Sequence, residues 1–225
     1  SLYPIWAALT PEMIRSASEV ALAELLQSGC TTTADHHYIF SDQLENAIDI
    51  QVEAANAIGC RVVLARGSMS LGEKDGGLPP NQTVQSAHTI LEDSERVIKR
   101  FHERDLGAFV QIALAPCSPF SVSEELMRET AALAEKFDVR LHTHLAETQD
   151  EEAFCIQKFG LRPLDYFDHV GWLHSDTWIA HGIHFNEEEI SRLGSAKVGI
   201  AHCPTSNMLL ASGTCRGIEL ENAGA

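Results

Sequence analysis

Six short runs of β-branched and apolar residues, separated by sequence with helical character, constrain the fold of this 225-residue chain most strongly. The runs lie at 30–34, 61–65, 108–115, 139–144, 177–181 and 197–201. Short strands joined by crossover helices predict a parallel β-sheet, either an open doubly wound sheet or a (β/α)8 barrel. No GxGxxG motif follows the first run, which disfavours the dinucleotide-binding version of the open sheet.

Polar and ionisable residues follow most of these predicted strands at their carboxyl ends: His36, His37, Arg66, Cys117, His144, His181 and His202. A barrel active site takes its groups from many strand ends around one mouth. We therefore predict an α/β protein with a TIM-type (β/α)8 barrel. Six strands do not close a barrel of eight. Residues 1–225 are expected to form one partial barrel domain, from the second strand to the seventh, lacking about one strand at each end.

Composition narrows the classes of partner. A formal net charge of -16 argues against nucleic-acid and anionic membrane partners, since both favour clustered Lys and Arg. No apolar run approaches the ~20 residues that cross a bilayer. The six cysteines are scattered and form no CxxC pair, which fits a reducing cytoplasm. A small, weakly charged substrate suits this chain best.

The run from Val139 to Glu147 (VRLHTHLAE) carries the clearest chemistry. Alternate strand residues share a face, so His142 and His144 point the same way, and a turn can bring Glu147 back beside His144. His181 and His202 end two further strands, and in a barrel such imidazoles can share a metal. Zinc would lower the pKa of its bound water, and Glu147 could take that proton. Taken alone, the run is also compatible with a buried strand carrying two hydrogen-bonded histidines.

Three ordered motifs resemble signatures of the amidohydrolase superfamily: HLAE at 144–147, AHGIH at 180–184 and AHCPTSN at 201–207. They are most similar to the branch of guanine deaminase, S-adenosylhomocysteine deaminase and the triazine hydrolases. PCSPF at 116–120 falls where that branch carries Pro-His-Ser-Pro. RGSMSLG at 66–72 and GGLPP at 76–80 look most like the 8-oxoguanine deaminases. The resemblance covers almost the whole chain.

The resemblance implies that His144 and His181 are metal ligands, that Glu147 is the proton shuttle, and that His202 polarises or orients the attacked centre. Family members also carry an HxH pair on the first strand and an Asp on the eighth. Neither is here, and the adjacent histidines at 36–37 cannot replace HxH, so these ligands are expected from the rest of the polypeptide. The fragment alone should bind zinc poorly and be inactive. Zinc is the expected metal, iron the alternative, and homodimers are common in the family.

The implied reaction is hydrolytic deamination of a purine-like heterocycle, with 8-oxoguanine as the leading substrate. A zinc-bound hydroxide would attack the amidine carbon, and Glu147 would protonate the nitrogen that leaves as ammonia. Arg66 matches a substrate-contacting arginine, although an ion pair beneath the barrel rim fits equally well. Cys117 replaces the branch's histidine with a smaller, weaker hydrogen-bonding group, which predicts a role in choosing the oxidised purine. Trp6 would line the substrate pocket or belong to the hydrophobic core.

Two other functions stay open. A triazine aminohydrolase or chlorohydrolase of the hydroxyatrazine type would use the same metal centre with a different leaving group. An inactive amidohydrolase-like binding module would need no complete ligand set.

Overall fold

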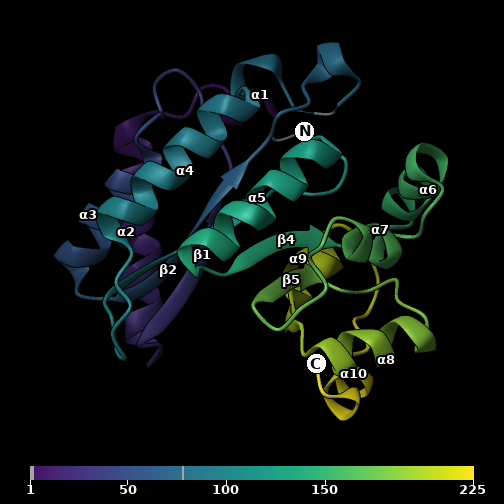
Figure 1. Ribbon diagram of the computed structural model, residues 1–225. Helices are drawn as coiled ribbons and strands as arrows, with labels where there is room; N and C mark the ends of the chain where they lie inside the picture. The colour runs from purple at the N-terminus through teal and green to yellow at the C-terminus, as the bar shows by residue number, and fades with distance from the viewer. Residues whose placement is uncertain (1–2, 78) are drawn as a thin grey trace. The chain divides into compact units, whose positions relative to one another are not determined.

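The computed structural model describes residues 3–77 and 79–225. Its internal contacts divide the chain into two compact units, one ending at Pro116 and the other starting at Cys117. Each unit has its own parallel strands and its own helices (Figure 1).

In the described residues up to 116, three parallel strands form a sheet: β1 (Thr32–His37), β2 (Arg61–Ser68) and β3 (Val110–Pro116). β2 is the middle strand and pairs in parallel with both others. The helices of this unit are α1 (Tyr3–Trp6), α2 (Pro11–Gln27), α3 (Ala47–Ile58) and α4 (Ala87–Phe101), with short 3-10 turns at Glu73–Asp75 and Asn81–Thr83.

Local capping sets where the helices of the first unit begin. Thr10 caps α2 by accepting a hydrogen bond from the Met13 backbone N–H at 3.3 Å, as its position before a proline predicts. Ser86 caps α4 through the Thr89 N–H at 3.1 Å. α3 begins at Ala47, after a run of turns and without a side-chain cap.

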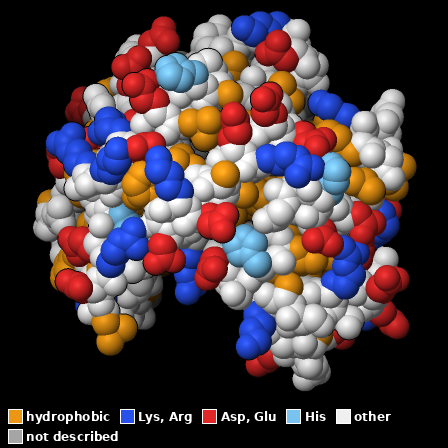
Figure 2. Space-filling view, viewed as in Figure 1, with side chains coloured by type: hydrophobic (Ala, Val, Ile, Leu, Met, Phe, Trp, Pro, Cys, Tyr) orange, Lys and Arg blue, Asp and Glu red, His pale blue; other side chains and the backbone are white. Residues whose placement is uncertain are grey.

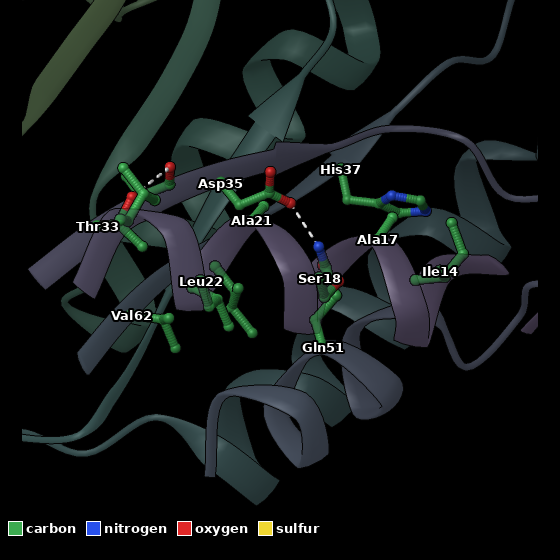
Figure 3. Close-up of a pocket in the computed structure, with 13 residues that line it drawn as sticks. Ile14, Ala17, Ser18, Ala21, Leu22, Thr33, Asp35, His37, Gln51 and Val62 are labelled. Atoms are coloured by element: carbon green, nitrogen blue, oxygen red, sulfur yellow. Dashed lines mark hydrogen bonds between the residues drawn. The ribbon is translucent and has the colours of Figure 1, made fainter. Parts of the chain in front are cut away.

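The prediction of a buried strand at 30–34 was wrong in position and in burial. β1 runs from Thr32 to His37, and Ala34 and Asp35 are exposed because β1 is the edge strand of its unit. Figure 3 shows the groove beside it, about 300 Å³ in volume and lined on one side by apolar residues of α2. Gln51 of α3 donates a hydrogen bond to the Asp35 carboxylate across this groove.

Residues 117–225 contain the parallel strands β4 (Leu141–Leu145), β5 (Thr177–His181) and β6 (Gly199–Ala201), with β5 in the middle. The helices of this unit are α5 (Glu124–Phe137), α6 (Gln149–Phe159), α7 (Pro163–His169), α8 (Glu187–Ala196), α9 (Pro204–Leu209) and α10 (Gly217–Ala223). β5 matches its predicted bounds. Ser123 caps α5 through the Leu126 N–H, and Glu124 is the first helical residue.

The core of the second unit centres on aromatic residues of α7 and the turn after it. Trp172 is fully buried, and its indole N–H donates to the Met127 carbonyl at 2.9 Å. That bond satisfies a polar group that would otherwise be buried at a cost. Leu126, Phe167 and Leu141 are also buried, and each such apolar side chain contributes roughly 1.5–3 kcal/mol.

Charged side chains lie on the surface of both units. On the face shown in Figure 2, Lys and Arg side chains are interspersed with Asp and Glu. Within residues 3–77 and 79–225, every helix is too short or too polar to cross a membrane.

Candidate active site

Two histidines meet at the carboxyl ends of neighbouring strands. His144 lies near the end of β4, and His181 ends β5. Parallel pairing sets Leu145 opposite His181, and the two imidazole rings stack with their centroids 5.4 Å apart and their planes at 30°. The sequence prediction that these side chains converge therefore matches the geometry of the second unit.

Each of these imidazoles is held through Nδ1. His144 Nδ1–H donates to the Cys117 carbonyl at 2.7 Å, and His181 Nδ1–H donates to the Asn207 side-chain oxygen at 2.8 Å. A hydrogen bond at one ring nitrogen fixes the tautomer and leaves the other nitrogen to bind a metal. Both rings therefore offer Nε2 as the metal-binding atom.

The Glu147 carboxylate lies next to His181. Its Oε1 is 3.5 Å from His181 Nε2, a contact that the sequence did not indicate. The predicted position beside His144 stays a prediction. In the turn after β4, Ala146 adopts a left-handed conformation with φ of 53°. His181 is also left-handed, with φ of 75°. Non-glycine residues in this region are strained, and such strain is found mostly at functional sites.

Burial keeps the histidines of β4 neutral. It lowers the pKa of His144 to about 4, with the proximity of His181 adding to the effect. Burial also lowers the pKa of His142 to about 3, helped by His144. Neutral imidazole is the form that binds metals. His142 stacks on Trp178 at 4.6 Å and donates to its carbonyl at 3.0 Å, so it packs against β5.

Cys117 contacts His144 through its backbone and its side chain. Its carbonyl oxygen accepts both the His144 backbone N–H at 3.1 Å and Nδ1–H, and its sulfur lies 3.8 Å from Nδ1. Burial raises the pKa of the thiol to about 12, so it stays protonated at neutral pH. A substitution at this position would change the side chain and leave the carbonyl in place.

The other predicted site residues lie as follows. Arg66, in the first unit, is buried, and its guanidinium donates to Asp93 at 3.0 Å, Gln85 at 2.8 Å and the Gly67 carbonyl at 2.7 Å. Burial lowers its pKa to about 10. This is the ion pair that the sequence left open, and a substrate contact for Arg66 stays a prediction.

Trp6 lies in α1, edge-on to the Tyr38 ring at 5.7 Å. His202 follows β6 directly and is exposed. Their predicted roles also stay predictions.

Two residues of the site escaped the sequence reasoning. Asn207 stood in the motif at 201–207 without an assigned role, and it holds His181. Glu151 is buried in the first turn of α6 and accepts the backbone N–H groups of Ala146 and Glu147. Its spacing from Thr148, the residue that caps α6, was the only available signal.

The donor set fits part of a divalent metal site. Two imidazoles with fixed tautomers and a neighbouring carboxylate are the chemistry that zinc prefers. Within residues 3–77 and 79–225, no group of three or more His, Cys, Asp or Glu side chains is arranged to hold a metal. The ligand role of His144 and His181 stays a prediction.

The fold and the arrangement of this site are those of one protein family. The family model described as "Amidohydrolase family" matches residues 2–225. The chain belongs to the amidohydrolase family.

Three similar proteins each align with at least 93% of this chain. It is 67% identical to 8-oxoguanine deaminase of Pseudomonas aeruginosa over 225 residues, covering 100% of this chain and 50% of that protein. It is 36% identical to hydroxydechloroatrazine ethylaminohydrolase of a Pseudomonas species, covering 93% of this chain and 43% of that protein. The crystal structure of atrazine chlorohydrolase TrzN from Arthrobacter aurescens complexed with zinc matches with a TM-score of 0.90 at 32% identity. That match covers 96% of this chain and 48% of the other.

These matches confirm the predicted family and the predicted fold class, an incomplete (β/α)8 barrel of the metal-dependent hydrolase type. The chain spans about half the length of the curated relatives it matches. The prediction that residues 1–225 form one domain stays a prediction.

Proposed function

We propose that the full-length protein containing this chain hydrolytically deaminates a purine-like heterocycle, with 8-oxoguanine as the first substrate to test. The observation that carries the proposal is the group formed by His144, His181 and Glu147, with both imidazoles held through Nδ1 and the carboxylate 3.5 Å from His181 Nε2. The 67% identity to a protein named 8-oxoguanine deaminase supports the choice of substrate.

The proposed ligands in this chain are His144 and His181, through Nε2. When bound, a divalent metal would make water acidic enough to act as a nucleophile near neutral pH. Zinc is the first candidate, supported by the zinc-complexed relative, and iron the second. Since the chain spans about half of its relatives, we propose that the remaining ligands, an HxH pair and an Asp, come from the rest of the polypeptide.

Glu147 moves the proton in this proposal. Its carboxylate takes a proton from the attacking water and gives it to the exocyclic nitrogen of the substrate, and the second proton of that water ends on the ring nitrogen. The carbon–nitrogen bond then breaks, ammonia leaves, and the ring carbon becomes a carbonyl. General acid–base catalysis of this kind contributes 10²–10⁴-fold in rate. His202 would orient or polarise the attacked centre from the end of β6.

The substrate is tested by measuring leaving groups from the metal-loaded full-length protein. We expect ammonia from 8-oxoguanine and no alkylamine from hydroxyatrazine. Alkylamine or chloride release from triazines, without ammonia from 8-oxoguanine, would replace the substrate by a triazine. Metal content with no turnover of either compound would favour an inactive binding module.

Cys117 provides a sharper test of specificity. We propose that its small, protonated thiol helps to select the oxidised purine, with Arg66 and Trp6 as further substrate contacts. Cys117→His should change the ratio of kcat/KM between 8-oxoguanine and guanine while the metal content stays the same. Cys117→Ser is the matched control and should change that ratio less. An unchanged ratio in Cys117→His would contradict this role.

The proposal also covers the cellular location and the oligomeric state of the protein. We expect a cytoplasmic protein, supported by the six cysteines, which are free in this structure. A homodimer, common in the family, is tested by light scattering of the full-length protein.

A further inference from the structure

The carboxylate of Glu151 reaches past the start of its own helix. α6 is capped by Thr148, whose hydroxyl accepts the Glu151 N–H at 3.3 Å. The Thr-x-x-Glu spacing usually forms a capping box, in which the Glu side chain accepts the N–H of the capping residue. Glu151 instead accepts the Ala146 N–H through Oε1 at 2.8 Å and the Glu147 N–H through Oε2 at 3.0 Å.

The start of α8 shows what the same spacing does when only a cap is formed. Asn186 caps α8 through the Glu189 N–H at 2.9 Å, and Glu189 Oε2 accepts the Asn186 N–H at 2.8 Å. Glu189 is buried but paired with Arg162. Among the described residues, the ion pairs do not include Glu151. A buried carboxylate without a cation is unfavourable for folding, so helix capping alone does not account for Glu151.

The turn that Glu151 holds is fixed from its other side as well. The Ala146 carbonyl accepts the backbone N–H groups of Ile183 at 2.9 Å and His184 at 3.0 Å, both from the turn after β5. Ala146 has φ of 53°, a conformation that needs support from its surroundings. The backbone of Ala146 is thus bound on both sides, and its direction sets where the Glu147 side chain begins.

We propose that Glu151 is a positioning residue that orients Glu147 for proton transfer. The proposal rests on the proposed function, because Glu147 is the proton carrier there. Glu151 binds the backbone N–H of Glu147, and the Glu147 carboxylate reaches His181. Loss of one of the two bonds at Glu151 would let the turn rotate and move the Glu147 carboxylate away from its working position.

Glu151→Gln in the full-length, metal-loaded protein tests this directly. The amide keeps the shape, but its NH₂ group faces a backbone N–H and loses one hydrogen bond. A displacement of about 1 Å at a catalytic group costs about 100-fold in rate. We therefore expect kcat to fall about 100-fold, with KM within threefold of wild type and an unchanged metal content.

Asp150→Asn is the matched control. Asp150 lies in the same first turn of α6 and is exposed, so this change converts another carboxylate at the same helix N-terminus into an amide. We expect kcat within twofold of wild type. Equal losses in the two variants would overturn the proposal, because helix electrostatics would then explain both.

A double-mutant cycle separates positioning from a general structural role. If Glu151 acts through Glu147, Glu151→Gln should change kcat less than twofold when Glu147→Gln is already present. A further loss near 100-fold in that background would overturn the proposal alone. A wild-type protein that holds metal but turns over neither test compound would instead overturn the proposed function and this inference with it.

Folding of the variants is checked by circular dichroism at 25 °C. Glu151→Asp is the second variant: it keeps the charge but withdraws the carboxylate by one methylene, and it should lose kcat like Glu151→Gln. If neither variant folds, the proposal is overturned, because Glu151 would then hold the fold as a whole.

Discussion

The turns after β4 and β5 contain the same kinds of residue, but their glutamates make different contacts. Each follows a strand that carries a histidine of the site, and each leads to a helix with a capping residue and a glutamate three residues later. After β5, Glu189 closes the cap and pairs with Arg162. After β4, Glu151 leaves the cap open and binds the turn that carries Glu147.

His144 and His181, which precede the two turns, are also held by different kinds of hydrogen-bond acceptor. His144 donates to a backbone carbonyl, that of Cys117, which no substitution removes. His181 donates to the Asn207 side chain, which a substitution can remove. The second turn therefore closes its helix cap and holds its histidine through one replaceable side chain, whereas the first is bound by Glu151 and carries Glu147, the proposed proton carrier.

The largest effect on stability is expected at the β5 turn. Glu189→Ala removes the capping box at Asn186 and the ion pair with Arg162, whose side chain is 31% exposed. Arg162 keeps Glu152 as a partner, so losing its bonds to Glu189 should cost about 2 kcal/mol in the free energy of unfolding. Urea unfolding of the full-length protein measures it, and kcat of the folded enzyme should stay within twofold. A large fall in kcat with unchanged stability would reverse the comparison.

A smaller effect, on metal affinity, is expected at His181, which precedes that turn. Asn207→Ala removes the acceptor of His181 Nδ1–H and frees the ring to rotate. Losing such an outer partner typically costs 10–100-fold in metal affinity, which chelator competition measures. Thr205→Ala, at an exposed position of the same helix, is the control and should leave the affinity unchanged. Equal affinity in Asn207→Ala and wild type would show that the ring is held by other contacts.

The smallest effect is a dependence of stability on pH that belongs to the β4 turn. Burial raises the pKa of Glu151 from 4.5 to about 7. Between these values the folded protein keeps a proton that the unfolded chain releases, so the contribution of Glu151 to stability falls as pH rises through this window. Wild type should lose on the order of 1 kcal/mol between pH 5 and 7 relative to Glu151→Gln. Parallel stability curves for the two proteins would contradict the raised pKa.

The sequence predicted much of this unit because its signals are local. Alternation along β4 and the apolar runs before His144 and His181 are readable from spacing, and β5 was predicted with its observed bounds. The partners of these histidines were not readable, because Asn207 lies 26 residues from His181 and Cys117 lies 27 from His144. Such contacts depend on how helices and turns pack over the strands.

One spacing in this unit has two outcomes. Thr148 with Glu151 and Asn186 with Glu189 share the same interval, yet only the second closes a capping box. In the first case Glu151 binds the backbone N–H groups of Ala146 and Glu147. Spacing alone does not distinguish the two cases, because the difference lies in the turn that each glutamate contacts.

The proposed role of Glu147 is to carry the proton at a metal held in part by His144 and His181. Glu147→Gln in the full-length protein keeps the side-chain shape and removes the basic carboxylate. We expect an unchanged metal content and ammonia release from 8-oxoguanine at least 100-fold slower than wild type. Release at the wild-type rate by the metal-loaded variant would contradict it.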